Sequence, residues 1–386
     1  MPEQILEVSA LAPLHFGDGR PFAASEGNET HARSLLMPLP SSFAGFVRTQ
    51  YARGSGLNLG NLEVLRQLHG LPVYGPVLFL DGQSYFPAPL DAIYSSDNPG
   101  SPAKRLRPVK QGAGGTDLPQ GMLPLKPAQA VKAGPGPALW SRREIEKWLI
   151  GNGSVSPKEA EPAEEIRVHV KINPERRSAE DGMLYSVAYR NLAAHVSRDE
   201  IKIWTLRGRV KLPAGAAVEE LGFLGGERRP VHLRLLDGLS EHWWDVPERI
   251  KQTFEQGELF ARGNKLVRMV LVTPALFSGG WKPGWIERSG TGEKHLPRGL
   301  AKVRLRLVAA AVGRRQPVSG WSLRENRPKP VRWAVPAGSV YFFEVEDGDP
   351  AAVLESWLRP ISDEEQDRKD GFGLAVWGVG SYASNS

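Results

Sequence analysis

Short apolar or alternating segments, separated by turn residues, recur along the whole chain. The opening segment, residues 4–14, begins with Ile5 and Leu6 and has the pattern of a buried strand. Residues 77–80 and 84–86 flank Asp81-Gly82, a pair typical of a tight hairpin turn. The next runs of this kind are residues 166–172, 183–189 and 201–211. The pattern therefore predicts a chain rich in β-strands.

Helical spacing interrupts these strands at three places in the first half of the chain. We expect helices at residues 41–53 and 61–69, the first of them capped by Ser41 or Ser42. A third helix is expected after Ser141, because Ser141 and Glu144 have the spacing of a capping box. The apolar residues expected to face inward are Phe43, Phe46, Val47 and Tyr51, then Leu62, Leu65 and Leu68, then Ile145, Trp148 and Leu149.

The last third of the chain repeats a recognisable order of elements. Strands are expected at residues 266–273, 301–312, 338–346 and 372–379, with a helix opening at Asp349-Pro350 between the last two. This order suits a ferredoxin-like (RRM-like) α+β fold. In residues 301–312 the alternation separates a basic face, Lys302, Arg304 and Arg306, from an apolar face, Val303, Leu305 and Leu307.

The pattern predicts an α+β protein with two ferredoxin-like domains and long loop insertions. The first domain is expected at residues 1–240 and the second at 260–386, with a helix from Asp245-Val246-Pro247 to near Gly257 at the boundary. Residues 95–140 are rich in Gly, Pro, Ser and Lys, which is typical of an inserted loop. Residues 151–165 are expected to form an acidic surface loop.

Composition narrows the classes of function. The chain has 386 residues, a net charge of +6 and no cysteine, which excludes disulfides and thiolate metal sites and fits a cytoplasmic location. A moderate basic excess favours a polyanionic partner without excluding a merely basic enzyme. We expect neither a membrane helix nor a secretory signal, because no apolar run is long enough and the N-terminus lacks a basic segment.

Motifs for catalysis are poor. The eight histidines show no spacing typical of metal ligands, and neither a G-x-S-x-G elbow nor a P-loop lysine is present, so we expect no metal and no cofactor. His31 is the exception, because it lies beside Arg33 in the expected loop 15–40 and could act as a general base in RNA cleavage. A loop histidine is more often polar lining, and no second acid or base is placed beside it.

Two turns near the N-terminus have the chemistry of phosphate sites. Gly17, Gly19 and Arg20 follow the opening strand, where glycine allows close approach and the guanidinium can fork onto a phosphate. Ser41 and Ser42 stand at the start of the first helix, with Arg48 two turns in. An ordinary turn and ordinary caps explain the same residues equally well.

Three further segments combine glycine, aromatic and basic residues. The tail at 371–380, GFGLAVWGVG, is a strand with an unusual number of glycines, typical either of close backbone approach or of a bulged edge strand. The other two, at 278–285 and 318–333, interleave tryptophan with Lys and Arg, as single-stranded RNA sites do, although tryptophans also pin loops onto a core. The candidate RNA-binding residues are Arg20, Arg33, Ser41, Ser42, Arg48, Trp281, Arg324, Lys329, Arg332, Gly371, Gly373, Gly378 and Gly380.

The order of these motifs resembles one known family, subunit three of the Cmr complex, in the RAMP superfamily of CRISPR proteins. The matching segments are DGRPF at 18–22, PLPSSFAG at 38–45 continuing to Arg48-Thr49, HVKINP at 169–174, AEDGMLY at 179–185, GGWKPGW at 279–285, VSGW at 318–321, PKP at 328–330, VPAGSVYF at 335–342, and the glycine-rich tail. The insertion at 95–140 matches nothing in the family's pattern.

The resemblance implies two ferredoxin-like domains and a non-catalytic, guide-RNA-binding role in a type III-B effector. It implies that the subunit holds the repeat-derived 5′ tag of the crRNA. It also implies docking to the large, cyclase-bearing subunit and to the first backbone subunit. Two other readings stay open: a RAMP-type endoribonuclease that processes the crRNA precursor with His31 as base, and a scaffold that meets only acidic proteins.

Overall fold

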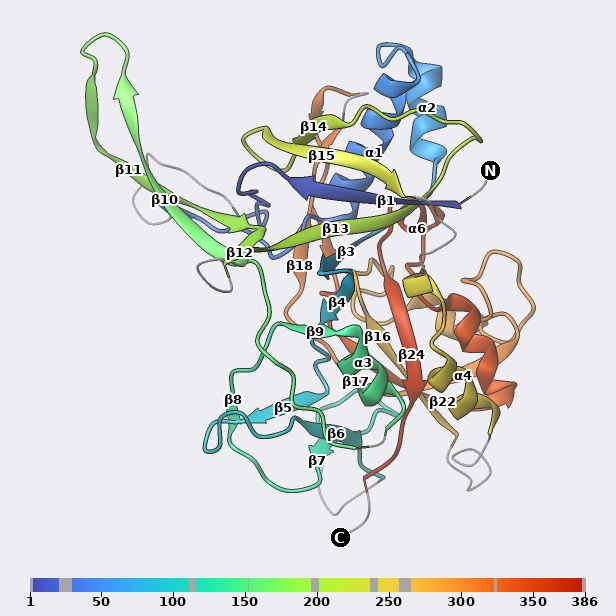
Figure 1. The fold of residues 1–386 in the computed structure, drawn as a ribbon. Coiled ribbons are helices and arrows are strands. Elements are labelled where there is room, and N and C mark those ends of the chain that lie inside the picture. The colour runs from blue at the N-terminus through green and yellow to red at the C-terminus, as the bar shows by residue number, and fades with distance from the viewer. Residues whose placement is uncertain are drawn as a thin grey trace. The chain divides into compact units, whose positions relative to one another are not determined.

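The chain forms two compact units, each assembled from separate stretches of sequence. The computed structural model describes residues 3–20, 30–110, 116–151, 153–195, 201–236, 242–256, 265–322 and 325–383. Unit 1 comprises Met1–Gly82, Glu161–Gly238 and Gln316–Trp333, and unit 2 comprises Gln83–Ala160, Leu239–Arg315 and Ala334–Ser386. Both units are mixed α/β with mainly antiparallel sheets (Figure 1).

An antiparallel sheet forms the centre of unit 1. Its strands follow the order β14 (Leu221–Leu224), β15 (Arg229–Leu236), β1 (Glu3–Ala10), β13 (Ile201–Lys211) and β3 (Val73–Leu80). The opening strand predicted from the sequence is thus confirmed, and Leu6 and Val8 are fully buried in it. A short strand, β12 (Ala193–His195), pairs with the start of β13. Asp81 and Gly82, after β3, both have positive φ angles (49° and 73°), as the expected hairpin turn requires.

Two helices cover part of this sheet. Helix α1 (Pro40–Gly54) lies against β3 and β14, and α2 (Leu62–Gly70) follows it. Phe43, Ala44 and Val47 form the buried face of α1, which accords with the predicted helix at 41–53. The predicted serine cap is wrong: α1 begins at Pro40 with Leu39 as N-cap and no capping side chain. Proline at the first helical position needs no amide partner, so it supplies the start signal instead.

A long hairpin extends from unit 1 beyond its sheet (Figure 1). It is formed by β10 (Ala163–Asn173) and β11 (Ser178–Asn191), and β2 (His31–Ala32) pairs in parallel with β11. One face of β10 exposes Ile166, Val168, Val170 and Ile172. The other face stacks His169 on Tyr185 and places Arg167 over Tyr189. The strands predicted at 166–172 and 183–189 are confirmed, and both are longer than expected.

Residues 316–333 complete unit 1 with short strands, of which the first is half-buried and the others are mostly exposed. They are β18 (Gln316–Val318), β19 (Trp321–Ser322), β20 (Arg327–Pro328) and the first residues of β21 (Arg332–Ala334). The pair β19–β20 forms a small hairpin, closed by a bond from the Lys329 amide to the Gly320 carbonyl (2.7 Å).

Unit 2 has its own sheet, with a strongly aromatic core. The strand order is β17 (Val303–Ala311), β22 (Val340–Gly348), β16 (Leu266–Leu271), β24 (Leu374–Val379) and β23 (Arg359–Pro360), all antiparallel. Phe343 lies at the centre, 5.7 Å from Trp285 and 5.9 Å from Trp377 between ring centroids. Burying each such ring contributes roughly 1.5–3 kcal/mol. The four strands predicted in the last third are confirmed.

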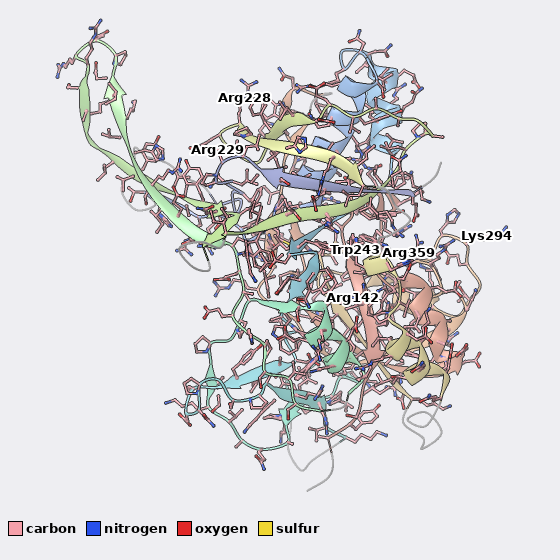
Figure 2. All side chains as sticks on the ribbon, viewed as in Figure 1. Arg142, Arg228, Arg229, Trp243, Lys294 and Arg359 are labelled. Atoms are coloured by element: carbon pink, nitrogen blue, oxygen red, sulfur yellow. The ribbon has the colours of Figure 1, made fainter. Side chains whose placement is uncertain are left out.

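Helices of unit 2 are short, and the N-termini of α3 (Arg142–Leu149) and η4 (Pro350–Ser356) are capped by side chains. Helix α3 starts with the predicted capping box: the Ser141 amide donates to the Glu144 carboxylate at 2.7 Å. Figure 2 shows Arg142 near Trp243; its guanidinium donates to carbonyls of the segment around η2 (His242–Trp244). Helix α4 (Glu248–Glu255) follows the predicted Pro247 start. The helix after Asp349 is a 3-10 helix, η4 (Pro350–Ser356), and the rest are η3 (Gly284–Arg288) and α6 (Glu365–Lys369).

The segment expected to be an inserted loop contains strands. It lies in unit 2 and holds β6 (Lys104–Pro108), β7 (Leu125–Pro127), β8 (Ala133–Gly134) and the first two residues of β9 (Leu139–Ser141), which pairs with β4 (Gln83–Pro87). With β5 (Ala92–Ser95) these give a small sheet of order β7-β6-β5-β8. Strands of two to five residues are too short for hydrophobic periodicity to predict. The glycine run at 112–115 lies outside the described residues.

Candidate nucleic-acid interface

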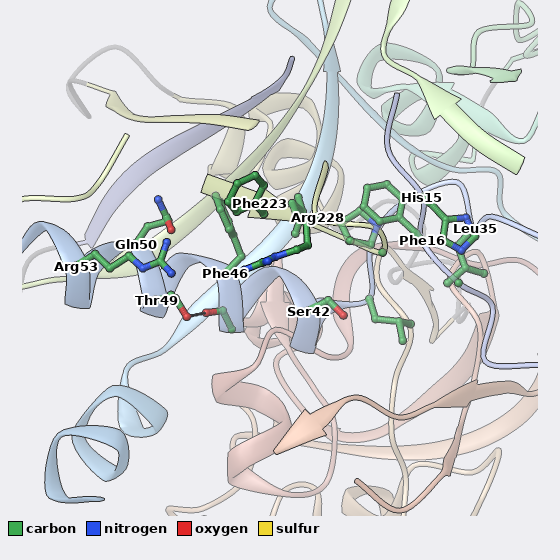
Figure 3. Close-up of a pocket in the computed structure, with 17 residues that line it drawn as sticks. His15, Phe16, Leu35, Ser42, Phe46, Thr49, Gln50, Arg53, Phe223 and Arg228 are labelled. Carbon is green, nitrogen blue, oxygen red and sulfur yellow. Dashed lines mark hydrogen bonds between the residues drawn. The ribbon is translucent and has the colours of Figure 1, made fainter. Parts of the chain in front are cut away.

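A groove of about 460 Å³ opens on unit 1 between α1 and the β14–β15 hairpin. Figure 3 shows His15 and Phe16 at one end, Gln50 and Arg53 at the other, and Phe223 and Arg228 between them. The described residues that line it are His15, Phe16, Gly17, Leu35, Pro38, Leu39, Ser42, Gly45, Phe46, Thr49, Gln50, Arg53, Phe223, Leu224, Gly225, Gly226 and Arg228. Its length and openness suit an extended ligand.

One wall of the groove is the exposed face of α1. Ser42, Gly45, Thr49 and Arg53 succeed one another every three or four residues, so they share that face. The first three are small, and a Cβ built on Gly45 would meet nothing within 4 Å. The Thr49 hydroxyl donates to the Gly45 carbonyl at 2.8 Å. A ligand can therefore approach the helix closely until it reaches the arginine.

The opposite wall is the turn that joins β14 to β15. Gly225, Glu227 and Arg228 all have positive φ angles, 80°, 58° and 50°. A Cβ on Gly225 would collide with the carbonyl of His15, so the glycine is required for this close packing. Glu227 and Arg228 are not glycine and hold this conformation at a cost of about 1–3 kcal/mol each. Such strain needs contacts that maintain it.

Glu227 provides those contacts on the side away from the groove. Its carboxylate accepts from the hydroxyl of Tyr189 and forms an ion pair with Arg229 at 2.8 Å. Burial alone would raise the pKa of Glu227, but the hydrogen bonds from Tyr189 and Arg229 outweigh it and lower the pKa. Burial and the same carboxylate raise the pKa of Tyr189. The negative charge is thus neutralised beside the turn.

Arg228 projects from this anchored turn toward Phe223. Its guanidinium carbon lies 5.7 Å from the ring centroid of Phe223, which is 55 % exposed. Figure 2 shows Arg228 and Arg229 together at the end of the hairpin. An exposed aromatic ring beside a guanidinium is the pairing that stacks a base and neutralises a phosphate.

The charge of the groove is one-sided. Of the described lining residues, Arg53 and Arg228 are cationic and none is acidic. Clefts lined by one sign of charge concentrate counter-charged ligands. A polyanion with planar, stackable groups therefore matches this groove better than a neutral metabolite.

The structure brings part of the first predicted site into the groove. Gly17 and Ser42 line it, and Ser41, one residue away, has a buried hydroxyl. Arg20 is exposed on the turn after Gly19 and pairs with Asp18 at 3.2 Å. Arg33 is exposed near β2. Pro21 and Phe22, which complete the motif, lie outside the described residues.

Arg48 has a different environment from the one predicted. It is 7 % exposed, and its Nε and Nη2 donate to the carbonyl of Leu71 at 3.1 and 2.7 Å. The residue points into the unit and ties α1 to the end of α2, because positions 48 and 49 lie on different faces of the helix. We therefore leave Arg48 out of the candidate interface.

His31 lies on strand β2 rather than in the loop where we expected it. Its Nδ1 is 2.8 Å from the hydroxyl of Ser186 on β11. This bond occupies one ring nitrogen in a structural contact between paired strands.

The glycine-rich tail is interior to unit 2. Residues 371–380 are all buried, and β24 lies between β16 and β23. A Cβ on Gly378 would overlap Leu149 of α3, and a Cβ on Gly373 would come within 2.9 Å of the Ser362 hydroxyl. These glycines allow a helix and a loop to pack on the strand. Gly371, Gly373, Gly378 and Gly380 therefore do not form a surface that RNA could reach in this structure.

The remaining predicted residues are dispersed. Lys329 and Arg332 are exposed in unit 1, whereas Trp281 is partly exposed in unit 2, and Arg324 lies outside the described residues. The basic face predicted on β17 is neutralised, because Arg306 pairs with Glu344 and Glu346 across the sheet and Arg304 with Glu346. None of these residues lines the groove.

Sequence reasoning missed the residues that give the groove its character: His15, Arg53, Phe223, Gly225, Gly226 and Arg228. The signal was present in LGFLGGERR at 221–229, where a glycine pair after a short strand precedes two arginines. Across the described residues we find neither a His/Asp/Glu cluster that could hold a metal nor a helix long and apolar enough to span a membrane.

Comparison with known proteins identifies the family. A family model described as a CRISPR-associated protein (Cas_Cmr3) matches residues 6–380. The chain belongs to the Cas_Cmr3 family. No curated protein matches this Cas_Cmr3 chain.

Three of the solved structures that match this chain are parts of CRISPR effector complexes. Two are chains of a type III-B Cmr-beta complex bound to cognate target RNA, one of them also with AMPPnP; they are 14% and 15% identical, cover 88% of this chain and 86% of theirs, and have a TM-score of 0.47. A chain of a Csm3–Csm4 subcomplex from a type III-A interference complex is 11% identical, covers 90% of this chain and 94% of its own, and has a TM-score of 0.33.

Proposed function

We propose that this Cas_Cmr3 protein is a non-catalytic subunit of a type III-B CRISPR effector and binds the 5′ tag of the guide RNA in the groove of unit 1. The observation that carries the proposal is the combination of Arg53, Arg228 and exposed Phe223 around a groove whose described lining contains no carboxylate. Family membership gives the biological setting.

The groove matches single-stranded RNA in three respects. The small face of α1 admits a sugar-phosphate backbone, the two arginines neutralise phosphates, and Phe223 offers a stacking surface for a base. Gln50 is held by bonds to the carbonyls of Glu219 and Leu221 (2.7 and 2.8 Å), which fixes the width of the groove beside β14. A preformed site of this kind loses little entropy on binding.

We further propose the domains, partners and cellular location that the sequence led us to expect. We propose two ferredoxin-like domains, which follow the discontinuous stretches of units 1 and 2 in place of the continuous ranges 1–240 and 260–386. The expected partners are the large, cyclase-bearing subunit and a backbone subunit, and the expected location is the cytoplasm. Ser42 lies in the groove itself, Arg20, Arg33 and Ser41 extend the RNA path beyond it, and the exposed residues Trp281, Lys329 and Arg332 are further proposed contacts.

A titration of guide RNA against the purified protein and its complex, at several salt concentrations, tests the proposal. Wild-type affinity should fall as salt rises, and the double variant Arg53→Ala/Arg228→Ala should bind more weakly with a shallower salt dependence. A matched control is Arg304→Ala/Arg306→Ala, because these arginines are already paired with glutamates. Equal affinities for all three proteins would reject the groove as the RNA site.

The same preparation separates binding from cleavage. Repeat RNA incubated without metal should stay intact in the presence of the wild type. Cleavage by the wild type that is lost in His31→Ala would establish the endoribonuclease reading instead.

A further inference from the structure

His15 stands at one end of the groove, and its ring is fixed by its surroundings. The Nδ1 atom lies 2.8 Å from the carbonyl oxygen of Ala188. The ring meets the edge of Tyr189, with centroids 5.9 Å apart and planes at 65°. The ring also packs closely on Gly226, because a Cβ atom added to Gly226 would lie 2.8 Å from Cδ2 of His15. The imidazole therefore has one orientation.

This orientation determines which ring nitrogen carries the proton. A carbonyl oxygen can only accept, so Nδ1 must be the donor in the bond to Ala188. In the neutral ring the other nitrogen, Nε2, is then an acceptor. In the described part of the chain no protein group hydrogen-bonds Nε2.

Gly17 keeps this acceptor accessible. A Cβ atom added to Gly17 would lie 3.7 Å from Nε2 of His15. Apart from the residues next to Gly17 in the chain, no other heavy atom of the described residues would lie within 4 Å of it. Gly17 is exposed and lines the groove together with His15. The missing side chain leaves open space beside Nε2, where a ligand group can enter.

Nε2 is an acceptor, whereas the two charged side chains of the groove are donors. The guanidinium groups of Arg53 and Arg228 only donate, which suits phosphate oxygens, and the Ser42 hydroxyl can both donate and accept. Phosphates have no donor for Nε2. The donors of a nucleic acid are the ribose 2′-hydroxyl and the N–H groups of bases. Because Gly17 lies beside Nε2 and Phe223 lies farther along the groove, the backbone rather than a base edge fits beside His15.

We propose that His15 Nε2 accepts a hydrogen bond from a ribose 2′-hydroxyl and makes the groove selective for RNA over DNA. The inference rests on the proposed function, because it requires nucleic acid in this groove. The 2′-hydroxyl is the group that distinguishes the two nucleic acids at a given site. One such bond corresponds to a discrimination of about three- to tenfold.

The test uses the full chain, in its complex, with guide RNAs whose tags carry ribose, 2′-deoxy or 2′-fluoro sugars. A 2′-fluoro group keeps the sugar pucker of RNA but cannot donate, so it separates hydrogen bonding from backbone shape. Wild type should bind the ribose tag about three- to tenfold more tightly than both others. His15→Phe should bind all three tags alike.

A second variant covers the chance that His15→Phe disturbs the turn. Gly17→Ala keeps His15 and places a methyl at ordinary contact distance from Nε2, so it should also reduce the discrimination. Gly70→Ala, with open space around its Cβ, is the matched control and should discriminate like the wild type.

The outcomes separate this inference from the proposed function. If Arg53→Ala/Arg228→Ala weakens binding but ribose preference persists unchanged in His15→Phe and Gly17→Ala, the role of His15 is wrong and the groove stands. If 2′-fluoro binds like ribose, a sugar-hydroxyl donor is excluded. If the arginine variant also binds normally, the groove itself is not the RNA site.

Discussion

Two glycine-rich segments of this chain are similar in sequence but differ in environment: one lines a groove and the other is buried. The segment LGFLGGERR at 221–229 forms a turn whose backbone and arginine line an open groove. The segment GFGLAVWGVG at 371–380 is wholly buried in unit 2. The difference lies in the neighbours: charged residues follow the glycine pair in the first, whereas Leu, Ala, Val and Trp separate the glycines in the second. Glycine shows only that something approaches closely, and the flanking residues show whether it is core or ligand.

The largest expected effect comes from filling the groove at Gly45. The variant Gly45→Leu places a side chain where a Cβ meets nothing within 4 Å, on the helix face that lines the groove. We expect guide-RNA affinity to fall by about 100-fold, or roughly 2.7 kcal/mol, in a binding titration. The fold should be at least as stable in a thermal melt, because leucine favours a helix over glycine by about 1 kcal/mol. Gly45→Ala is the control, and normal binding by Gly45→Leu would contradict the account.

The buried segment should respond in the opposite way. The variant Gly378→Ala forces a methyl against Leu149 of α3, so unfolding free energy should fall by about 1–3 kcal/mol. Denaturant titration of the variant beside Gly70→Ala measures this difference. RNA affinity of the folded variant should equal that of the wild type. A loss of RNA binding without a loss of stability would show that the glycine-rich tail belongs to the RNA interface.

Arg228, on the β14–β15 turn, and Arg48, on α1, allow the same comparison between a groove residue and a buried residue. Arg228→Ala should weaken RNA binding by about tenfold and reduce the slope of log affinity against log salt by about 0.7. Arg48→Ala should leave that slope unchanged and lower the melting temperature, since the Leu71 carbonyl loses its donors. Reversed behaviour of the two variants would invalidate the assignment of Arg48 to the interior.

The smallest expected effect is on the pH dependence of stability, through the carboxylate of Glu227. Because the folded pKa of Glu227 lies below its ordinary value of 4.5, its ionised form stabilises the folded state at pH values above 4.5. That contribution should disappear as the pH falls through the lowered pKa. Melting temperatures of wild type and Glu227→Gln, measured from about pH 7 to about pH 3, should therefore converge at the acid end. A constant difference across that range would show that the charge of Glu227 is irrelevant to the turn.

Much of the local structure was predictable from the sequence, because local signals determine it. Alternation identified β17, the Ser141–Glu144 pair identified α3, and Pro247 marked α4. The tertiary neighbours were not predictable in this way. The glutamates that neutralise Arg304 and Arg306 stand on another strand, and the carbonyl that binds Arg48 is 23 residues away.

The candidate site shows the same limit. Ser42 and Gly17 were predicted from turn chemistry, and both line the groove. Phe223 and Arg228 reach it through the pairing of β14 with β15 and the packing of that hairpin near α1, which no spacing in the sequence encodes. The glycine-rich tail was predicted to bind RNA but is buried. Close packing in a core and close approach of a ligand both require glycine, so the sequence alone does not separate them.

Photocrosslinking within the assembled complex tests the central claim most directly. A photoreactive phenylalanine analogue at position 223, beside Arg228, is compared with the same group at the exposed position 166 of the β10–β11 hairpin, using end-labelled guide RNA. We expect crosslinks from position 223 to nucleotides of the 5′ tag. No crosslink from position 223, or crosslinks only to the 3′ part of the guide, would contradict it.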